Sequence, residues 1–379
     1  MALPSGPAAG CAPVQTPWPR RLTRQVTVGG VPLGGGAPVS VQAMTKTDTR
    51  DVAATAAQAQ ALAEAGAEIV RIAVPDEEAA AAFGRVRRLV AVPLVADIHF
   101  DYRLAIEAAR QGADKLRLNP GNIGDDERLG QVVAAARERG IPLRAGVNAG
   151  SLEPDLRQAH GGPTPAALAE SAVRTVARLE RLGADDIVVS IKAADVPTTV
   201  AATRALVERS DRPLHLGITE AGFGEEAVIA STAGLAILLA EGIGDTLRVS
   251  LTDDPCREVE VGLRVLRALE LRRGPRLISC PACGRCRVAL RPIAEQVLAG
   301  MATLRTPLRV AVMGCEVNGP GEAREADVGL AAGKGKAVLF ARGRKLRTVP
   351  IEEAAEALLA EARRMDEGEA TEPHPRPLS

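Results

Sequence analysis

The chain has 379 residues, equal numbers of acidic and basic side chains, and only 2% aromatic residues. A net charge of zero gives no electrostatic footprint for nucleic acid or anionic lipid, and scarce aromatic rings disfavour stacking on single strands. No uncharged run approaches the roughly 20 apolar residues that span a bilayer, so we expect neither a membrane segment nor a nucleic-acid partner.

Both ends of the chain are poor in the apolar residues that a core needs. Residues 1–20 are rich in proline and small residues without the apolar centre of a signal peptide, and residues 366–379 are polar. We expect both segments to be disordered tails and the protein to be cytoplasmic. Residues 25–38 then have the pattern of a hairpin that precedes the first domain.

Short β-branched apolar runs alternate with alanine-rich segments over residues 21–271. The eight strand-like runs are residues 39–45, 68–75, 93–100, 115–121, 143–150, 187–195, 214–222 and 246–252. The intervening segments carry apolar residues at helical spacing and end in glycine, as helices do. This alternation predicts an α/β fold, a (β/α)8 TIM-like barrel. The competing doubly wound sheet would carry a glycine-rich first turn, which is missing.

A second pattern over residues 272–365 predicts a small α+β domain. Its elements, in order, are a strand at 276–280, a helix at 287–301, a strand at 308–314, strand segments at 327–333 and 336–349, and a helix at 351–365. Gly274 and Pro275 separate it from the barrel.

Polar residues interrupt the second half of nearly every barrel strand, where a buried strand should be apolar. Barrel enzymes place their chemistry at these C-terminal strand ends. The residues that we single out are Arg71, Asp97, His99, Arg117, Arg144, Asn148, Lys192, His215, Glu220 and Arg248. Each alone is equally well explained as an interior ion pair. Together they predict a cationic site for a polyanionic small molecule, with Asp97 and Glu220 as candidates to orient a cation or move protons.

The six cysteines are too few for a disulfide scaffold, and their clustering favours a metal or catalytic site. Cys280, Cys283 and Cys286 follow one strand, and Cys315 follows the next. Neighbouring parallel strand ends meet, so we expect Cys280, Cys283 and Cys315 to meet, with the following Asn-Gly-Pro-Gly loop returning Glu322 toward them. The spacing suits an iron–sulfur cluster or a structural zinc site, although a second Cys-x-x-Cys pair is missing. Cys286 is either a further ligand or a bystander.

Nine segments in fixed order carry a resemblance to a known family. They are SVQAMTKTDT, VADIHFDYRLA, KLRLNPGNIG, RAGVNAGSLE, VSIKAAD, LGITEAG, GIGDTLRVSLT, SCPACGR and VMGCEVNGPGEA. The chain resembles the IspG/GcpE family of iron–sulfur enzymes, the 4-hydroxy-3-methylbut-2-enyl diphosphate synthases, from about Arg21 to Met365. The resemblance implies a barrel joined to a domain that binds a [4Fe–4S] cluster through three cysteines and one glutamate. In this chain these are Cys280, Cys283, Cys315 and Glu322.

The family's reaction implies roles for the remaining residues. It reduces 2-C-methyl-D-erythritol 2,4-cyclodiphosphate to the linear allylic diphosphate in the methylerythritol phosphate route to isoprenoids, with flavodoxin or ferredoxin as electron donor and a homodimer as the working form. By analogy Glu220 is the proton donor and Glu322 marks one iron as distinct. The residues placed around the diphosphate are Arg71, Arg117, Arg144, Asn148, Lys192, His215 and Arg248.

Three positions depart from the family pattern: Ala43, Lys46 and Cys286. We expect Ala43 and Lys46 to tune the pocket rather than abolish function. Two rival hypotheses stay open at this point. One is a pterin-binding barrel with a structural zinc domain, and the other is an iron–sulfur carrier without catalysis.

Overall fold

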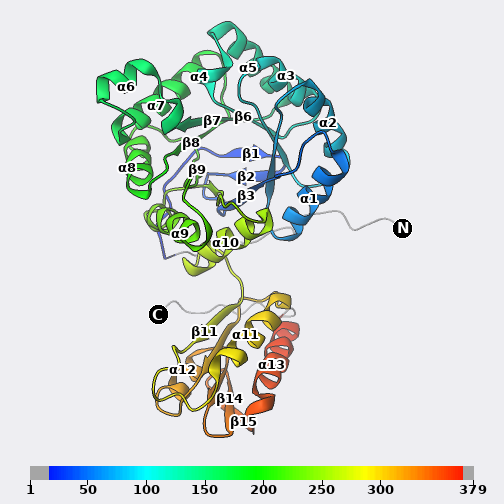
Figure 1. Cartoon of the computed structure of the whole chain (residues 1–379), viewed down its shortest axis with the longest axis vertical. Coiled ribbons are helices and arrows are strands. Elements are labelled where there is room, and N and C mark those ends of the chain that lie inside the picture. The colour runs from blue at the N-terminus through cyan, green and yellow to red at the C-terminus, as the bar shows by residue number, and fades with distance from the viewer. Residues whose placement is uncertain (1–16, 370–379) are drawn as a thin grey trace. The chain divides into compact units, whose positions relative to one another are not determined.

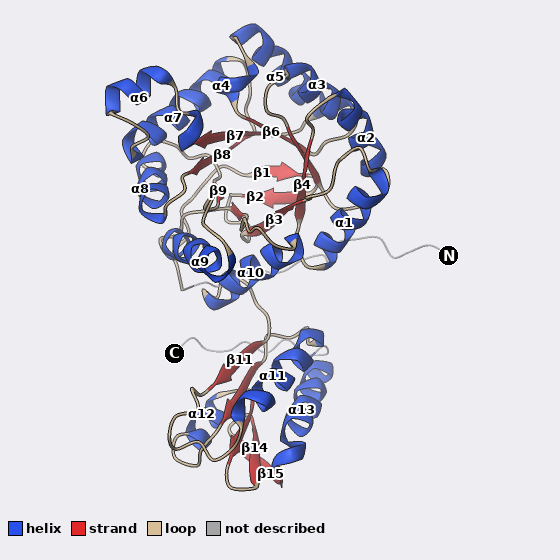
Figure 2. Cartoon of the chain, in the orientation of Figure 1, coloured by secondary structure: helices blue, strands red, loops and turns tan. Residues whose placement is uncertain are grey.

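The computed structural model describes residues 17–369, which form two units divided between Arg272 and Arg273. The first unit is an eight-stranded parallel barrel ringed by helices, as Figure 1 shows. The second is a five-stranded sheet with helices (Figure 2). The predicted α/β fold, a TIM-like barrel followed by a small α+β domain, is confirmed. Every helix within residues 17–369 is too short or too polar to cross a bilayer.

The barrel strands occur where the apolar runs predict them. They are β3 (Ser40–Met44), β4 (Ile69–Ala73), β5 (Leu94–Asp97), β6 (Lys115–Leu118), β7 (Leu143–Asn148), β8 (Ile187–Lys192), β9 (His215–Leu216) and β10 (Thr246–Leu247). The sheet order is β8-β7-β6-β5-β4-β3-β10-β9, and a single parallel bridge from Val189 to Leu214 joins β8 to β9. β9 and β10 are much shorter than the predicted runs, although a backbone hydrogen bond from Arg248 to Leu216 continues the pairing beyond them.

Eight main helices alternate with the barrel strands. They are α1 (Val52–Glu64), α2 (Glu77–Arg87), α3 (Tyr102–Arg110), α5 (Asp126–Arg139), α7 (Pro165–Arg181), α8 (Val196–Val207), α9 (Gly224–Ala240) and α10 (Pro255–Ala268); α4 (Pro120–Ile123), η1 (Ala149–Ser151) and α6 (Pro154–His160) are short insertions. Seven begin at a side chain that accepts a hydrogen bond from the first turn: Asp51, Asp76, Asp101, Asp125, Thr164, Asp195 and Asp254. These caps satisfy backbone N–H groups where each loop enters its helix.

A hairpin seals one end of the barrel. Strands β1 (Val26–Val28) and β2 (Val31–Leu33) pair antiparallel. Their buried side chains pack on Ile69, Val95 and Val188, which lie at or near the N-terminal ends of β4, β5 and β8. The C-terminal strand ends, where the polar residues lie, are therefore at the opposite end of the barrel.

The second unit is a mixed sheet in the order β11-β12-β13-β14-β15. Its elements are β11 (Arg276–Ser279), α11 (Leu290–Gly300), η2 (Met301–Thr303), β12 (Arg309–Met313), α12 (Gly319–Glu325), β13 (Val328–Ala332), β14 (Lys336–Ala341), β15 (Arg344–Pro350), η3 (Ile351–Glu353) and α13 (Ala354–Glu369). β11, β12 and β13 are parallel, and β14 and β15 continue antiparallel. The predicted strand segment at 336–349 is thus a hairpin that turns at Arg342 and Gly343, both of which have positive φ.

The predicted tails fall mostly outside the described residues, which exclude 1–16 and 370–379. Residues 17–20 were included in the predicted tail, yet Trp18 Nε1 donates to the Leu269 carbonyl at 2.8 Å and Arg20 Nη2 to that of Gly244 at 2.8 Å. Residues 366–369 extend α13 instead of being tail. These two hydrogen bonds anchor residues 17–20 to the barrel.

Candidate active site

The charged residues predicted at the barrel rim come from seven consecutive strands. Arg71 lies in β4, Asp97 ends β5, Arg117 lies in β6, Arg144 and Asn148 in β7, Lys192 ends β8, His215 begins β9, and Arg248 follows β10. Six of these side chains are buried: Arg71, Asp97, Arg117, Arg144, Lys192 and His215. Alternate residues of a barrel strand point to its interior, which is how single strands can deliver charge there while Ile, Val and Leu face the helices.

Asp97 is the acidic centre of this group. Its Oδ1 lies 3.0 Å from Arg117 Nη1 and its Oδ2 lies 3.5 Å from Arg71 Nε. Burial would raise the pKa of Asp97, but the positive charges of Arg71 and Arg117 outweigh it and hold the pKa below its ordinary value. His99 Nε2 lies 3.0 Å from Arg117 Nη1, so the predicted His99 also belongs to this network. Asp97 is therefore an ionised carboxylate that orients the guanidinium groups of Arg71 and Arg117.

Arg144 lies deeper and contacts neutral acceptors. Its Nε donates to Ser190 Oγ and its Nη1 to Gln42 Oε1, each at 3.3 Å. Burial, followed by the positive charge of Arg71 and Arg117, lowers the pKa of Arg144 well below its ordinary value. Both of these hydrogen bonds of Arg144 thus use neutral acceptors instead of a carboxylate.

Lys192 and His215 lie in the same charged interior. Burial is the main cause that lowers the pKa of both well below their ordinary values, and Arg144 contributes to each. Gly217 gives Lys192 its space, because a Cβ at Gly217 would lie 2.9 Å from Lys192 Nζ and 2.6 Å from the Arg248 carbonyl oxygen. Any larger residue there would push apart β9 and the backbone that follows β10.

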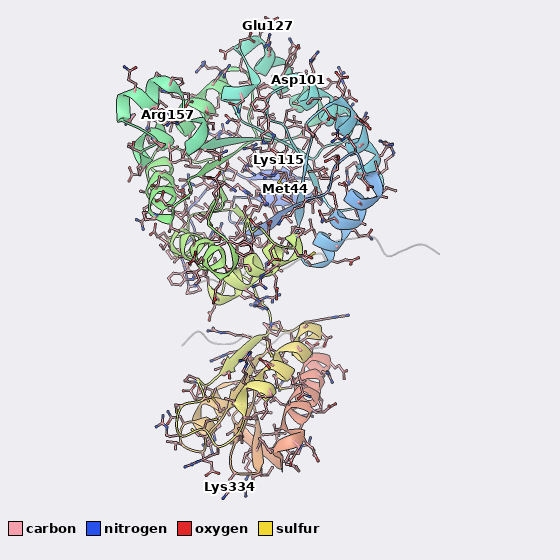
Figure 3. All side chains as sticks on the ribbon, viewed as in Figure 1. Met44, Asp101, Lys115, Glu127, Arg157 and Lys334 are labelled. Atoms are coloured by element: carbon pink, nitrogen blue, oxygen red, sulfur yellow. The ribbon has the colours of Figure 1, made fainter. Side chains whose placement is uncertain are left out.

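Lys115 is a buried member of this interior that the sequence analysis did not single out. Figure 3 labels it inside the ring of helices, together with Met44, whose sulfur accepts from Arg71 Nη2 at 2.8 Å. Within residues 17–369, Lys115 Nζ has no hydrogen-bond partner although the residue is 0% exposed. Burial and the charges of Arg144 and Arg71 lower the pKa of Lys115 well below its ordinary value. The alternation of Lys115 and Arg117 in β6 was the signal that would have found it.

Glu258 is a second functional candidate that the sequence did not reveal. It lies in the first turn of α10, is 1% exposed, and its Oε2 is 3.1 Å from Arg248 Nη2. In the sequence it looks like one more charged residue of an amphipathic helix, so only its burial distinguishes it.

Three predicted residues lie nearer to solvent. Glu220, in the loop after β9, is exposed and has a left-handed backbone with φ of 59°. Such a conformation is strained for a residue with a side chain and is found preferentially at functional sites. Asn148 is partly exposed and the side chain of His99 is 48% exposed. These three therefore lie where an incoming ligand can reach them, above the buried charges.

The cysteines follow two neighbouring parallel strands, β11 and β12, as the sequence predicts. Cys280 pairs with β12 through its N–H to the Val312 carbonyl at 3.3 Å, and the Gly314 N–H lies 3.3 Å from Cys280 Sγ. A Cβ on Gly314 would lie 3.5 Å from Cys280 Sγ and 2.4 Å from Cys286 Sγ. Gly314 thus lets two thiols approach the end of β12.

Hydrogen bonds favour the thiolate forms of Cys283 and Cys315. Backbone and side-chain hydrogen bonds from Arg285 lower the pKa of Cys283, and backbone N–H groups of Asn318 and Val317 lower that of Cys315. The two groups also interact electrostatically with one another. Thiolate is the form of cysteine that binds metals, and N–H donors to sulfur are typical of iron–sulfur sites.

Glu322 lies in the first turn of α12 and is exposed. The segment read as a loop is the start of this helix, with Pro320 as its second residue, in the first turn, where proline is tolerated. Within residues 17–369, no three His, Cys, Asp or Glu side chains are gathered in an arrangement that holds a metal ion. The donor set of three thiols and a carboxylate nonetheless fits an iron–sulfur cluster, and the four ligands remain a prediction.

The fold and its two polar regions define a TIM-barrel enzyme whose barrel has a charged interior and whose second unit carries the clustered cysteines. The profile of the GcpE TIM-barrel domain matches residues 23–263, and that of the GcpE protein C-terminal domain matches residues 276–364. The chain therefore belongs to the GcpE family, as the sequence resemblance indicated.

Curated relatives cover nearly the whole chain. A protein of Geobacter sulfurreducens is 57% identical over 90% of this chain and 98% of its own length. A protein of Thermodesulfovibrio yellowstonii is 51% identical over 91% of this chain and 99% of its own. Both are named 4-hydroxy-3-methylbut-2-en-1-yl diphosphate synthase (flavodoxin).

Solved structures that resemble the chain align with about two thirds of it. Dihydropteroate synthase from Xanthomonas albilineans, in complex with 7,8-dihydropteroate, aligns at a TM-score of 0.47 and 19% identity over 65% of this chain and 98% of that one. A likeness this low bears on neither substrate nor mechanism. The rival pterin-binding hypothesis is not favoured, because the family match extends through both units.

Proposed function

We propose that the chain is a 4-hydroxy-3-methylbut-2-enyl diphosphate synthase of the methylerythritol phosphate route to isoprenoids. It opens the ring of 2-C-methyl-D-erythritol 2,4-cyclodiphosphate, using two electrons. One ring bond from carbon to a phosphate oxygen breaks and one hydroxyl leaves as water, so the reaction needs an electron source, a proton donor and a cradle for the diphosphate. The names of relatives that are 50–57% identical support this assignment.

The single observation that carries the proposal is the buried positive charge of the barrel. Four arginines (Arg71, Arg117, Arg144 and the partly buried Arg248) lie around two carboxylates, Asp97 and Glu258, and Lys192, whose pKa is lowered by burial, lies among them. Such an excess of buried cations is costly without an anion, and planar guanidinium groups suit phosphate oxygens. A diphosphate supplies the missing negative charge. When the ring bond breaks, negative charge develops on the departing phosphate oxygen, and the same residues would stabilise it.

The residues of the second unit fit the proposed cofactor. Cys280, Cys283, Cys315 and Glu322 would hold a [4Fe–4S] cluster, which when bound supplies electrons one at a time. Three sulfur ligands and one oxygen ligand would make the iron bound by Glu322 chemically distinct. The N–H groups that lower the pKa of Cys315 would stabilise the negative charge on its sulfur.

Glu220 is the proposed proton donor to the departing hydroxyl. It is exposed at the C-terminal end of the barrel, and its left-handed backbone fixes how its side chain leaves the loop. His99 and Asn148, which are also accessible, are the proposed contacts to the substrate's polar groups beside the diphosphate. His215 lies too deep for direct proton transfer and completes the lining of the diphosphate site.

We further propose that flavodoxin is the electron donor, with ferredoxin as the alternative, and that two copies of the chain form a homodimer. The names of the relatives support flavodoxin. Apolar side chains at both functional regions support association: Phe100 and Phe223 follow barrel strands and are 73% exposed, and Val317 beside Cys315 is 65% exposed. Large exposed apolar side chains of this kind mark interaction surfaces.

The decisive experiment is anaerobic turnover. Iron-loaded, reduced protein is mixed with the cyclic diphosphate, and the linear diphosphate is measured. Native protein should form it with either reduced flavodoxin or a chemical reductant. Glu220→Gln should lose about 100-fold or more in kcat while retaining its iron, as removal of a proton donor does. The exposed Glu225→Gln is the control. Unchanged turnover in Glu220→Gln would remove Glu220 from the mechanism, whereas iron-loaded native protein that forms no linear diphosphate would favour the carrier hypothesis.

Complementation tests the assembly. Glu220→Gln and Cys315→Ser variants are each expected to be inactive, and equimolar mixing after subunit exchange is measured for turnover. Recovery of activity together with a dimeric mass in sedimentation would show that one copy supplies electrons to the other. A monomeric mass at micromolar concentration would contradict the homodimer.

A further inference from the structure

Lys46 and Glu258 lie beside the proposed diphosphate site, yet neither is among the groups that would contact the substrate. Lys46 is in the loop after β3, and its side chain is 34% exposed. Glu258 is in α10 and is 1% exposed. The loop of Lys46 precedes α1, so the two residues come from opposite ends of the barrel sequence and meet where β3 and β10 are neighbours.

The Glu258 carboxylate is shared between two cations. Its Oε1 lies 3.1 Å from Lys46 Nζ, and its Oε2 lies 3.1 Å from Arg248 Nη2. Oε1 also accepts from the Leu251 N–H at 2.9 Å. Lys46 Nζ donates in addition to the carbonyl oxygens of Leu251, at 2.7 Å, and Asp253. Every oxygen of this buried carboxylate and the head of Lys46 therefore have defined partners.

The charge balance shows what Lys46 contributes. Glu258 and Arg248 alone would form a neutral pair, and Arg248 would offer an anion little net attraction. Lys46 brings the trio to a net charge of +1, and its bonds to the Leu251 and Asp253 carbonyls hold the loop that links Arg248 to α10. In a poorly hydrated site one added charge changes the energy of a nearby anion substantially.

We propose that Lys46 is a positioning residue that sets the affinity of the barrel for the diphosphate by sharing Glu258 with Arg248. Glu258 holds the guanidinium of Arg248 in place, and Lys46 compensates the negative charge of Glu258. Neither needs to touch the substrate. This inference rests on the proposed function, because it assigns Arg248 to the diphosphate.

The test measures binding of inorganic pyrophosphate to the full chain by calorimetry in about 50 mM salt. Lys46→Met should weaken binding about three- to tenfold, the range expected for one compensating charge near the site. Lys46→Arg should bind within about twofold of native protein. The control is Arg50→Met, which removes a positive charge from the same loop. Arg50 pairs with Asp48 and Asp76 instead of Glu258.

Two further readouts separate positioning from a merely structural role. The gap between native and Lys46→Met should shrink in about 0.5 M salt, where charges are screened beyond a few ångström. With the cyclic diphosphate, Lys46→Met should raise KM with little change in kcat, because it removes binding common to ground and transition states.

Glu258→Gln completes a double-mutant cycle. In that background Lys46→Met should lose less pyrophosphate affinity than it does in native protein, because the shared carboxylate that holds Lys46 beside Arg248 is gone. Equal binding by native and Lys46→Met protein, or an undiminished loss in the Glu258→Gln background, would overturn the proposal. If Glu258→Gln does not fold, the comparison of Lys46→Met with Lys46→Arg still decides. If native protein binds no pyrophosphate, the anion site fails and both proposals fall, whereas binding without turnover contradicts the proposed function alone.

Discussion

The barrel interior and the cysteine loops represent two ways of preparing a site. In the barrel, Arg71, Arg117 and Arg144 are buried and held by Asp97, Ser190 and Gln42 before any ligand is present. In the second unit, Cys283 and Glu322 are exposed, and no metal-holding group of side chains is gathered within residues 17–369. On the proposed function, the substrate anion would meet a site that is already formed, whereas the cluster ligands on short turns would be brought together by the group that they bind.

The largest expected effect breaks the second site while sparing the first. Cys315→Ser should lose bound iron and all detectable turnover, because one sulfur ligand of the proposed cluster is missing. Binding of pyrophosphate to the barrel should stay within about twofold of native, as expected for independent sites. Iron and sulfide analysis after anaerobic purification makes the measurement. Cys256→Ser, in α10 of the barrel, is the control and should keep its iron; full iron in Cys315→Ser would refute the ligand assignment.

Breaking the prepared site should cost stability as well as activity. Asp97→Asn leaves Arg71 and Arg117 without their shared carboxylate and should destabilise the protein by about 3–5 kcal/mol, as removal of one partner of a buried ion pair does. Urea unfolding followed by circular dichroism gives the value. Asp155→Asn removes an exposed pair with Arg174 and should cost no more than about 1 kcal/mol. Equal losses in both variants would contradict the role of Asp97.

The same pair predicts a pH dependence. The pKa of Asp97 is lower in the folded chain than its ordinary value, so its stabilisation is complete above about pH 4 and is lost as pH falls through the folded pKa. The stability difference between native protein and Asp97→Asn should therefore narrow as the pH is lowered from about 5 to 2. A constant difference over that range would show that Asp97 titrates alike in both states.

Removing a buried charge should have the opposite effect on stability from Asp97→Asn, because a buried amine without a partner is expected to destabilise the fold. The pKa of Lys115 is lowered in the folded chain, so at neutral pH the unfolded chain holds its proton more firmly and the residue costs stability. Lys115→Met should thus stabilise the protein by about 1–4 kcal/mol. Lys334→Met, at an exposed turn, should change stability little. A lower melting temperature for Lys115→Met would show that its ammonium has a buried partner.

The smallest effect concerns the room between the thiols. Gly314→Ala places a Cβ 2.4 Å from Cys286 Sγ and 3.2 Å from Leu290 Cδ2. We expect a loss of about 1–3 kcal/mol in stability from overpacking, with lower iron occupancy. Combining it with Cys286→Ala should recover most of both, since the closest atom is removed. Failure of the double variant to recover would place the strain at Leu290.

Much of the barrel could be predicted because one periodicity controls it. Each apolar run contains a strand, and the polar residues that break the runs supply the charged interior. The same rule, applied to every residue of the strand, would also have found Lys115, two residues before Arg117 in β6. Glu258 could not be found this way, because burial of a helical glutamate depends on Lys46 and Arg248, distant in sequence.

The second unit was harder to predict in detail, because its turns determine where the helices and strands begin and end. The glycine and proline residues around Pro320 are typical of a loop, yet proline also suits the first turn of a helix, and α12 begins there. Arg342 and Gly343 adopt positive φ and fold one predicted strand segment into a hairpin. Such choices depend on contacts across the sheet, which a linear pattern does not contain.

The β1–β2 hairpin has a consequence for how fast a ligand arrives. Because Val26, Val28 and Leu33 close the barrel at its N-terminal end, the field of its interior charges emerges through a single mouth. Because the protein has no net charge, an anionic ligand in solution is then attracted to this opening and not to the surface as a whole. The association rate of the substrate should accordingly fall as ionic strength rises. The apolar β1–β2 hairpin, although distant from the reacting groups, thus helps to determine where the substrate enters.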